Sequence, residues 1–110
     1  MDFNYEECTP RAHRSGQLYQ IRVADLHPTQ CGVGLDEVNA KAEAMRNRSK
    51  DELLAYLITH PVPIVIGNDD KFYLTDHHHL ARALWDAAQG KNEAGIDPDN
   101  ARVVVEVLYN

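Results

Sequence analysis

The run Val62–Ile66 constrains the fold of this chain more than any other part of its sequence. All five of its residues are apolar, and a short continuous apolar run is typical of a β-strand buried on both faces. Pro63 cannot donate a backbone hydrogen bond, so we expect it near the start of this strand or exposed along an edge. The sequence therefore predicts a sheet that contains this segment.

Further strands and helices are predicted on both sides of this run. Alternating polarity and β-forming residues predict strands, and apolar stripes with helical spacing predict helices. The expected strands are Leu18–Val23, Phe72–Thr75 and Arg102–Tyr109, and the expected helices run over about 35–48, from 49 to Pro61, and over about 77–89. The resulting order, β-α-α-β-β-α-β, indicates a small α/β sheet domain.

Each expected helix has one apolar face for the core. In the second helix, Ser49 and Glu52 also form the Ser-x-x-Glu pattern of a capping box. The expected core positions are Leu35, Val38, Ala42 and Met45 in the first helix, Leu53, Leu54, Leu57 and Ile58 in the second, and Leu80, Ala81, Leu84 and Ala88 in the third.

Length and composition fit one soluble domain. The 110 residues are 44% hydrophobic and 25% charged, and no apolar run approaches the roughly 20 residues of a bilayer span. Residues 1–16 show no period and contain Pro10 and Gly16, so we expect a flexible N-terminal arm before a single domain over 17–110. The first residues lack the pattern of a secretory signal. The expected location is the cytoplasm, with no membrane partner.

Charge and cysteine content exclude further classes. The formal net charge of −6 opposes the counterion release that drives nonspecific nucleic-acid binding, which disfavours duplex DNA as a partner. Cys8 and Cys31 lack the spacing of a disulfide framework or, even with His13 and His27 nearby, of a zinc site. We therefore expect free thiols and no metal held by the protein alone.

Three consecutive histidines, His77–His79, follow Asp76 where the expected strand gives way to a helix. A helix N-terminus presents unpaired backbone N–H groups and a partial positive charge, so it favours anions. Successive helical residues are rotated by about 100°, so the three rings cannot all bind one metal ion from this helix. The pattern predicts an anion site rather than a three-histidine metal site.

The helical spacing separates the roles of these histidines. His78 and His79 share a face with Arg82, so we expect these three residues around an oxyanion or phosphate. His78 or His79 would be the acid or base in any catalysis. The alternative is a solvated polar face. His77 shares a stripe with apolar positions, so it is either a ligand contact or a semi-buried histidine bonded to a backbone carbonyl.

Three other residues complete the candidate ligand site. Asp76 is expected to be the N-cap of the helix, and in a functional role it would orient a histidine or meet a metal ion on the ligand. Lys41 lies at the margin of an apolar stripe, where it either extends along the surface or delivers a charge to a pocket. Gln30, like Thr29, is a loop donor after the first strand, although such residues are more often turn residues.

Two blocks of the sequence carry a resemblance to a known family. The first runs from Val23 through Pro28-Thr29-Gln30 to Lys41, and the second from Pro63 through the Asp-His-His-His motif to Ala81. In combination they resemble the ParB/sulfiredoxin superfamily, and within it the ParB-like nuclease group, over about residues 20–89. The resemblance implies a small mixed sheet packed with helices, and a ligand pocket between the loop after the first strand and the helix opened by the motif.

The motif departs from the best-known members of that superfamily. ParB relatives open this helix with Gly-Glu-Arg-Arg-x-Arg, and sulfiredoxin opens it with Gly-Cys-His-Arg. By position, His77 replaces the glycine, His78 the Glu or Cys, His79 an Arg or His and Leu80 an Arg, whereas Arg82 matches the last Arg of the ParB motif. These losses argue against CTP hydrolysis of the ParB kind and against sulfiredoxin's thiol chemistry.

The leading hypothesis from the sequence is a domain that binds a phosphorylated ligand, first of all a nucleotide, alone or with Mg²⁺ as its cofactor. If chemistry follows, it would be phosphoryl or phosphodiester transfer. Arg82 or Lys41 would then steady phosphate charge. One alternative is a non-catalytic protein-interaction module. Another is a metal-dependent nuclease whose histidines gather further ligands from Asp76, His27 or His60. The residues leave open whether the domain is an enzyme.

Overall fold

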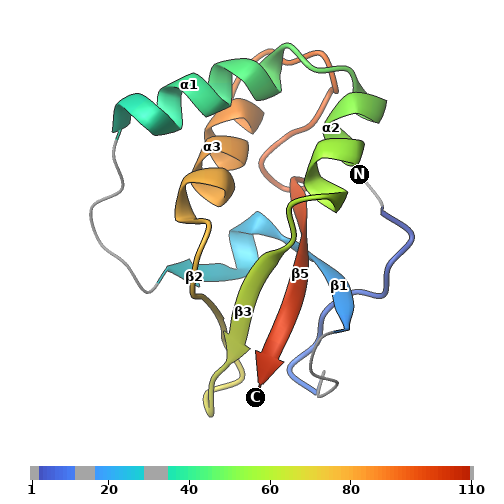
Figure 1. Cartoon of the computed structure of the whole chain (residues 1–110), viewed down its shortest axis with the longest axis vertical. Helices are drawn as coiled ribbons and strands as arrows, with labels where there is room; N and C mark the ends of the chain where they lie inside the picture. The colour runs from blue at the N-terminus through green and yellow to red at the C-terminus, as the bar shows by residue number, and fades with distance from the viewer. Residues whose placement is uncertain (1–2, 12–16, 29–34, 110) are drawn as a thin grey trace.

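The computed structural model describes residues 3–11, 17–28 and 35–109. Its strands form one five-stranded sheet in the order β1-β5-β3-β4-β2 (Figure 1). The β1/β5 and β3/β4 pairs are antiparallel, whereas the β3/β5 and β2/β4 pairs are parallel. The strands are β1 (Leu18–Arg22), β2 (Leu26–Pro28), β3 (Val62–Ile66), β4 (Phe72–Leu74) and β5 (Arg102–Tyr109). The expected small mixed α/β sheet domain is confirmed.

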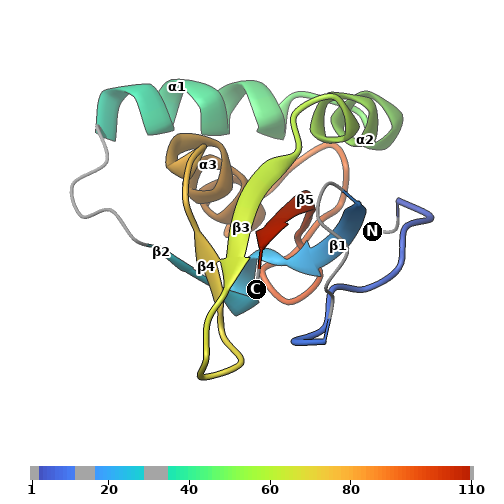
Figure 2. The ribbon, with the colours of Figure 1, turned by 60° about the horizontal axis from the view of Figure 1, so that its bottom comes forward.

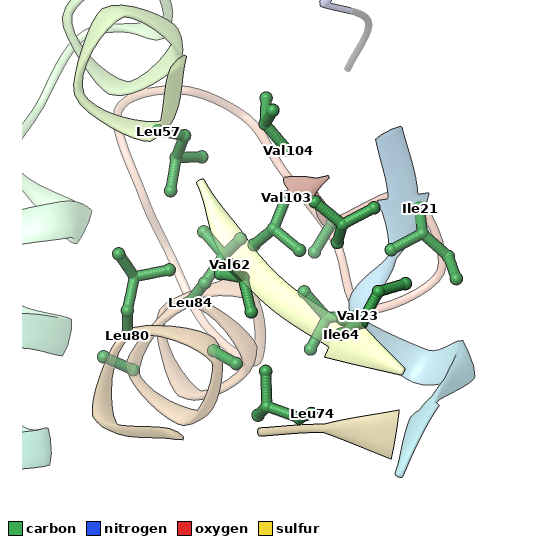
Figure 3. Packing of buried hydrophobic residues seen from close by; sticks show 14 of the residues in the cluster. Ile21, Val23, Leu57, Val62, Ile64, Leu74, Leu80, Leu84, Val103 and Val104 are labelled. Atoms are coloured by element: carbon green, nitrogen blue, oxygen red, sulfur yellow. The ribbon is translucent and has the colours of Figure 1, made fainter. Parts of the chain in front are cut away.

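Helices α1 (Leu35–Arg46), α2 (Lys50–Ile58) and α3 (His78–Ala88) lie on one side of this sheet (Figure 2). A short 3-10 helix, η1 (Val23–Asp25), joins β1 to β2. Helix α3 lies between α1 and the strands, and its apolar side chains meet those of β3 and β4 in the core (Figure 3). None of the described helices has the length and apolar character required to cross a bilayer.

The core contains most of the expected apolar positions. The third helix buries all four of its predicted residues, and the first buries Val38, Ala42 and Met45. In α2 only Leu53 and Leu57 are fully buried; Leu54 is half-buried and Ile58 is 38% exposed. The capping box of α2 is present, with Ser49 and Glu52 bonded reciprocally.

The central strand β3 is buried less completely than its composition suggests. Val62, Ile64 and Ile66 are buried, whereas Pro63 and Val65 on the other face are half-buried. Burial on both faces was therefore wrong for this strand, because helices cover one side of the sheet. Pro63 lies near the start of the strand, as expected, but β3 pairs with β4 and β5 and is not an edge.

The segment after the first strand contains two elements that the sequence did not predict. Strand β2 occupies residues that were expected to belong to the loop after the first strand, and η1 begins at Val23, which was expected to end that strand. Strand β2 pairs in parallel with β4, with Pro28 opposite Leu74. The carboxyl ends of β2 and β4 therefore meet at the same end of the sheet, and α3 begins beside them (Figure 1).

The first part of the expected N-terminal arm is docked on the sheet. Cys8 donates its backbone N–H to the carbonyl of Gln20 at 2.8 Å, and Gln20 donates its N–H to the carbonyl of Glu6 at 2.9 Å. The buried Gln20 amide also accepts from the N–H of Phe3 and donates to the carbonyl of Tyr5. Phe3 and Cys8 are buried in the core. Residues 3–8 thus form part of the folded domain.

Candidate functional site

The junction between β4 and α3 fixes where the histidine motif lies. Thr75 donates both its N–H and its hydroxyl to the carbonyl of Pro63, each at 3.1 Å. His77 then adopts a left-handed backbone, with φ 58° and ψ 34°, and is the N-cap of α3. Such a conformation is uncommon for a residue with a side chain. Helix α3 therefore begins at His78, one residue later than predicted.

The later start changes the roles of Asp76 and His77. Asp76 was expected to be the N-cap and to hold an amide of the first turn; instead its Oδ1 accepts from the N–H of His77 at 2.7 Å. His77 was expected to share the apolar stripe of the helix, but it is exposed because its left-handed backbone takes it off that stripe. The His77 side chain makes no capping hydrogen bond. The backbone N–H groups in the first turn of α3 therefore donate no hydrogen bond to the side chain of the N-cap residue.

His78 is the buried histidine of the motif. It is 6% exposed, although its predicted face also carries Arg82, which is exposed. Its Nε2 atom is buried and has no hydrogen-bond partner. Among the side-chain nitrogen and oxygen atoms of the described residues, it is the one buried atom in this state. Buried polar groups in folded proteins are nearly always bonded, so an orphaned imidazole nitrogen requires a specific explanation.

His79 joins the first turns of two helices. Its Nε2 lies 3.1 Å from Oε2 of Glu37, which belongs to the first turn of α1. The two side chains are 35% and 62% exposed, respectively. Glu37 was missed by the sequence reasoning, because its acidic side chain at a helix N-terminus is already explained by the helix dipole. The starts of α1 and α3 therefore meet at an accessible acid–imidazole pair.

The remaining predicted residues lie further along the two helices or outside the described residues. Arg82 lies one turn along α3 and its Nε donates to Oδ1 of Asp86 at 3.2 Å, so its exposed guanidinium is partly engaged. Lys41 lies one turn beyond Glu37 on α1 and is half-buried. Gln30 and Thr29 lie outside the described residues.

The other titratable side chains proposed for a metal site lie apart. The His27 ring packs against Tyr73 on β4, and the His60 ring stacks on Tyr56 at the end of α2. In the described ranges, no group of three or more His, Cys, Asp or Glu residues is placed to hold a metal ion. The gathering of Asp76, His27 or His60 around the motif, which the metal-dependent nuclease hypothesis requires, is therefore not observed.

Cys8 does not offer a reactive thiol. It is free and buried, and burial raises its pKa from 9.0 to about 11, with a smaller contribution from the charge of Glu7. A thiol with so high a pKa stays protonated and is a poor nucleophile. Cys8 thus serves the core, and Cys31 lies outside the described residues.

Comparisons with known proteins agree on the family and the fold of this chain. A family model described as "Putative ParB-like nuclease" matches residues 19–110. The crystal structure of protein Atu1540 from Agrobacterium tumefaciens is similar at 33% sequence identity, with a TM-score of 0.61 over 84% of this chain and 39% of that chain. The present chain thus spans 39% of the length of that solved protein. No curated protein matches the chain.

Proposed function

Because the chain belongs to the ParB-like nuclease family, we propose that its domain binds a phosphorylated small molecule, specifically a nucleotide, at the N-terminus of α3. A helix of this length presents unpaired N–H groups and roughly half a positive charge at its start. Phosphate groups bind well at such positions. The missing side-chain cap at His77 leaves the first turn open to a ligand oxygen.

The observation that carries this proposal is the orphaned Nε2 of His78. A buried donor or acceptor without a partner costs about 1–3 kcal/mol, so a ligand atom that bonds to Nε2 would remove this cost. A phosphate oxygen at the start of α3 would accept a hydrogen bond from Nε2–H in the neutral ring. Ligand binding would then recover the cost of burying the imidazole.

The surrounding side chains supply charge for a phosphate. Arg82 would bind a phosphate oxygen in exchange for its hydrogen bond to Asp86. Lys41 would add a second positive charge from α1. Asp76 is exposed beside the site, where a Mg²⁺ ion carried by the nucleotide would find a carboxylate oxygen. The ligand that fits this set is a nucleotide polyphosphate, alone or with Mg²⁺.

The chemistry that this set supports is phosphoryl or phosphodiester transfer. His79 is half-exposed and able to exchange protons with a ligand, so in this proposal it is the acid or base, and His78 orients the phosphate from within. Positive charge from Arg82 and Lys41 would stabilise the charge that develops in the transition state.

Isothermal titration of the whole chain with ATP, CTP and ADP, each with and without Mg²⁺, tests the proposal. We expect binding heat with at least one of them. His78→Ala should weaken that binding at least about tenfold, because a bond from a buried donor to a charged acceptor contributes roughly 1.5–3 kcal/mol.

His60→Ala is the matched control for this titration. The His60 ring is bonded to the carbonyl of Tyr56 at 2.7 Å and stacks on the Tyr56 ring, so its contacts are with α2 and its loss should change nucleotide affinity less than about twofold. Absence of heat with all of these nucleotides, or equal affinity in wild type and His78→Ala, would refute the proposal. Retained function in cells with both His78 and His79 replaced by Ala would instead favour the protein-interaction module.

A further inference from the structure

The pair between His79 and Glu37 places an internal carboxylate at the start of α3. Oε2 of Glu37 is 3.1 Å from Nε2 of His79, which is in the first turn of that helix. The carboxylate comes from a different helix, so its position depends on how α1 and α3 pack. An anion of the protein itself therefore already occupies a donor at the position where the proposed function needs a ligand anion.

A carboxylate and a phosphate cannot both use this donor fully. The Nε2 atom of His79 carries at most one hydrogen, and both groups are acceptors when ionised. Two negative groups that meet at one imidazole also repel each other across a few ångströms. A phosphate that reaches His79 must therefore displace Glu37 or bind beside it more weakly.

The exposure of the two side chains makes displacement physically easy. The Glu37 side chain is 62% exposed, and within the described residues it forms an ion pair with His79. An exposed pair of this kind contributes little stability, so opening it leaves the packing of α1 on α3 intact. The buried stripe of α1, from Val38 to Met45, does not involve the Glu37 side chain.

We propose that Glu37 is a competing anion that occupies His79 in the unliganded protein and sets the affinity of the site for phosphate. This inference rests on the proposed function, because it assumes that a phosphorylated ligand binds at the start of α3. It assigns to Glu37 a role in specificity: a ligand binds only if its phosphate charge outcompetes a carboxylate. Neutral or weakly charged ligands leave the pair closed.

Isothermal titration of the whole chain with inorganic pyrophosphate and with ADP, both without Mg²⁺, tests this role. Glu37→Gln keeps the size of the side chain and removes its charge. We expect it to bind either probe about fivefold tighter than wild type, which is the scale of one exposed charge pair. The gain should vanish in Glu37→Gln/His79→Ala, because the competition requires the imidazole.

Asp36→Asn is the matched control. Asp36 is the neighbouring acidic residue of the same helical turn, is exposed, and is not paired with His79. The substitution removes the same charge, so it should change affinity less than about twofold. Thermal melting of each variant without ligand verifies that the fold is retained.

The outcomes separate the two proposals. If the wild type binds the probe and Glu37→Gln binds it no more tightly, the competition is overturned and the proposed function stands. Weaker binding by Glu37→Gln would mean that Glu37 assists the ligand. An equal gain in Asp36→Asn also overturns it, because the effect would then be general charge. Binding by Glu37→Gln alone supports both proposals, and absence of binding in every protein refutes both.

Discussion

His78 is the residue at which stability and ligand binding are expected to oppose each other. Its buried Nε2 lacks a partner, so the folded state carries the cost of desolvating a polar atom. Replacing the ring by an apolar side chain of similar size removes that cost. We predict that His78→Leu raises the free energy of unfolding by about 1 kcal/mol while nucleotide binding is lost.

Urea denaturation of wild type and His78→Leu measures this change, and His60→Leu is the contrast. The ring of His60 is bonded to Tyr56 and to the hydroxyl of Thr59, so the same substitution there breaks bonds and should not stabilise the protein. A His78→Leu variant less stable than wild type would indicate that Nε2 already has a favourable environment in the unliganded fold.

The residue scale also shows where sequence reasoning fails. The motif was recognised from its composition and its place before a helix, but the buried ring was assigned wrongly. The left-handed backbone of His77 places that residue outside the helix and exposes its ring. His78 lies three residues before the buried Ala81, so its burial follows from helical spacing, which the prediction had used to group it with the exposed Arg82. Local backbone strain of this kind has no reliable signature in a histidine-rich stretch.

At the scale of elements, the capping box of α2 makes a prediction about pH. Glu52 accepts from the N–H of Ser49 at 3.3 Å, and the Ser49 hydroxyl accepts from the N–H of Glu52 at 3.2 Å. Bonding to the Ser49 side chain, then to its backbone, lowers the pKa of Glu52 below its ordinary 4.5. A lowered folded-state pKa stabilises the protein above the unfolded value, and this contribution is lost as the pH falls through the folded value.

Ser49→Ala should therefore destabilise the protein by about 1 kcal/mol at neutral pH, the usual effect of losing an N-cap. Its deficit relative to wild type should shrink well below pH 4.5, where Glu52 becomes protonated in both proteins. Thermal melting across this pH range measures the difference. Ser49→Thr keeps the hydroxyl and should follow wild type closely, whereas a deficit independent of pH would contradict the role assigned to Glu52.

The elements that could be predicted are those with strong local signals. The ends of β5 and the buried stripes of α1 and α3 follow from runs of valine and from helical spacing. Strand β2 was missed because its three residues contain a proline and form a strand only by pairing with β4. The contact of Glu37 with His79 was missed because the helix dipole already explains an acidic residue at that position, and because the contact depends on how two helices far apart in the sequence pack.

At the scale of the whole molecule, the N-terminal segment contributes to the core. Phe3 is 6% exposed, and its N–H is bonded to the side chain of Gln20 on β1. Truncating a buried phenylalanine removes its burial and leaves a cavity. We predict that Phe3→Ala lowers the free energy of unfolding by about 3 kcal/mol, as measured by urea denaturation.

Tyr5→Ala is a useful comparison for this prediction. Tyr5 is only half-buried, and its bond to Gln20 uses its backbone carbonyl, which the substitution keeps, so its effect should be clearly smaller. If Phe3→Ala costs less than about 0.5 kcal/mol, the segment contributes little to folding and behaves as the loose arm expected from its composition. Composition alone could not reveal the docking, because the segment is held by two buried side chains, Phe3 and Cys8, and by hydrogen bonds to Gln20.

The docking of residues 6–8 along β1 has a consequence for self-association. Strand β1 lies at one margin of the sheet, and Glu7 forms a parallel bridge with Gln20 there. The opposite margin is β2, which is three residues long and ends in proline. Exposed edge strands can form backbone hydrogen bonds with strands of other copies. Here one edge is partly covered and the other is short and ends in proline, which disfavours such pairing. Removing the residues before Cys8 would expose part of the β1 edge, so we expect the shortened protein to pair with further copies through β1 and to aggregate more readily.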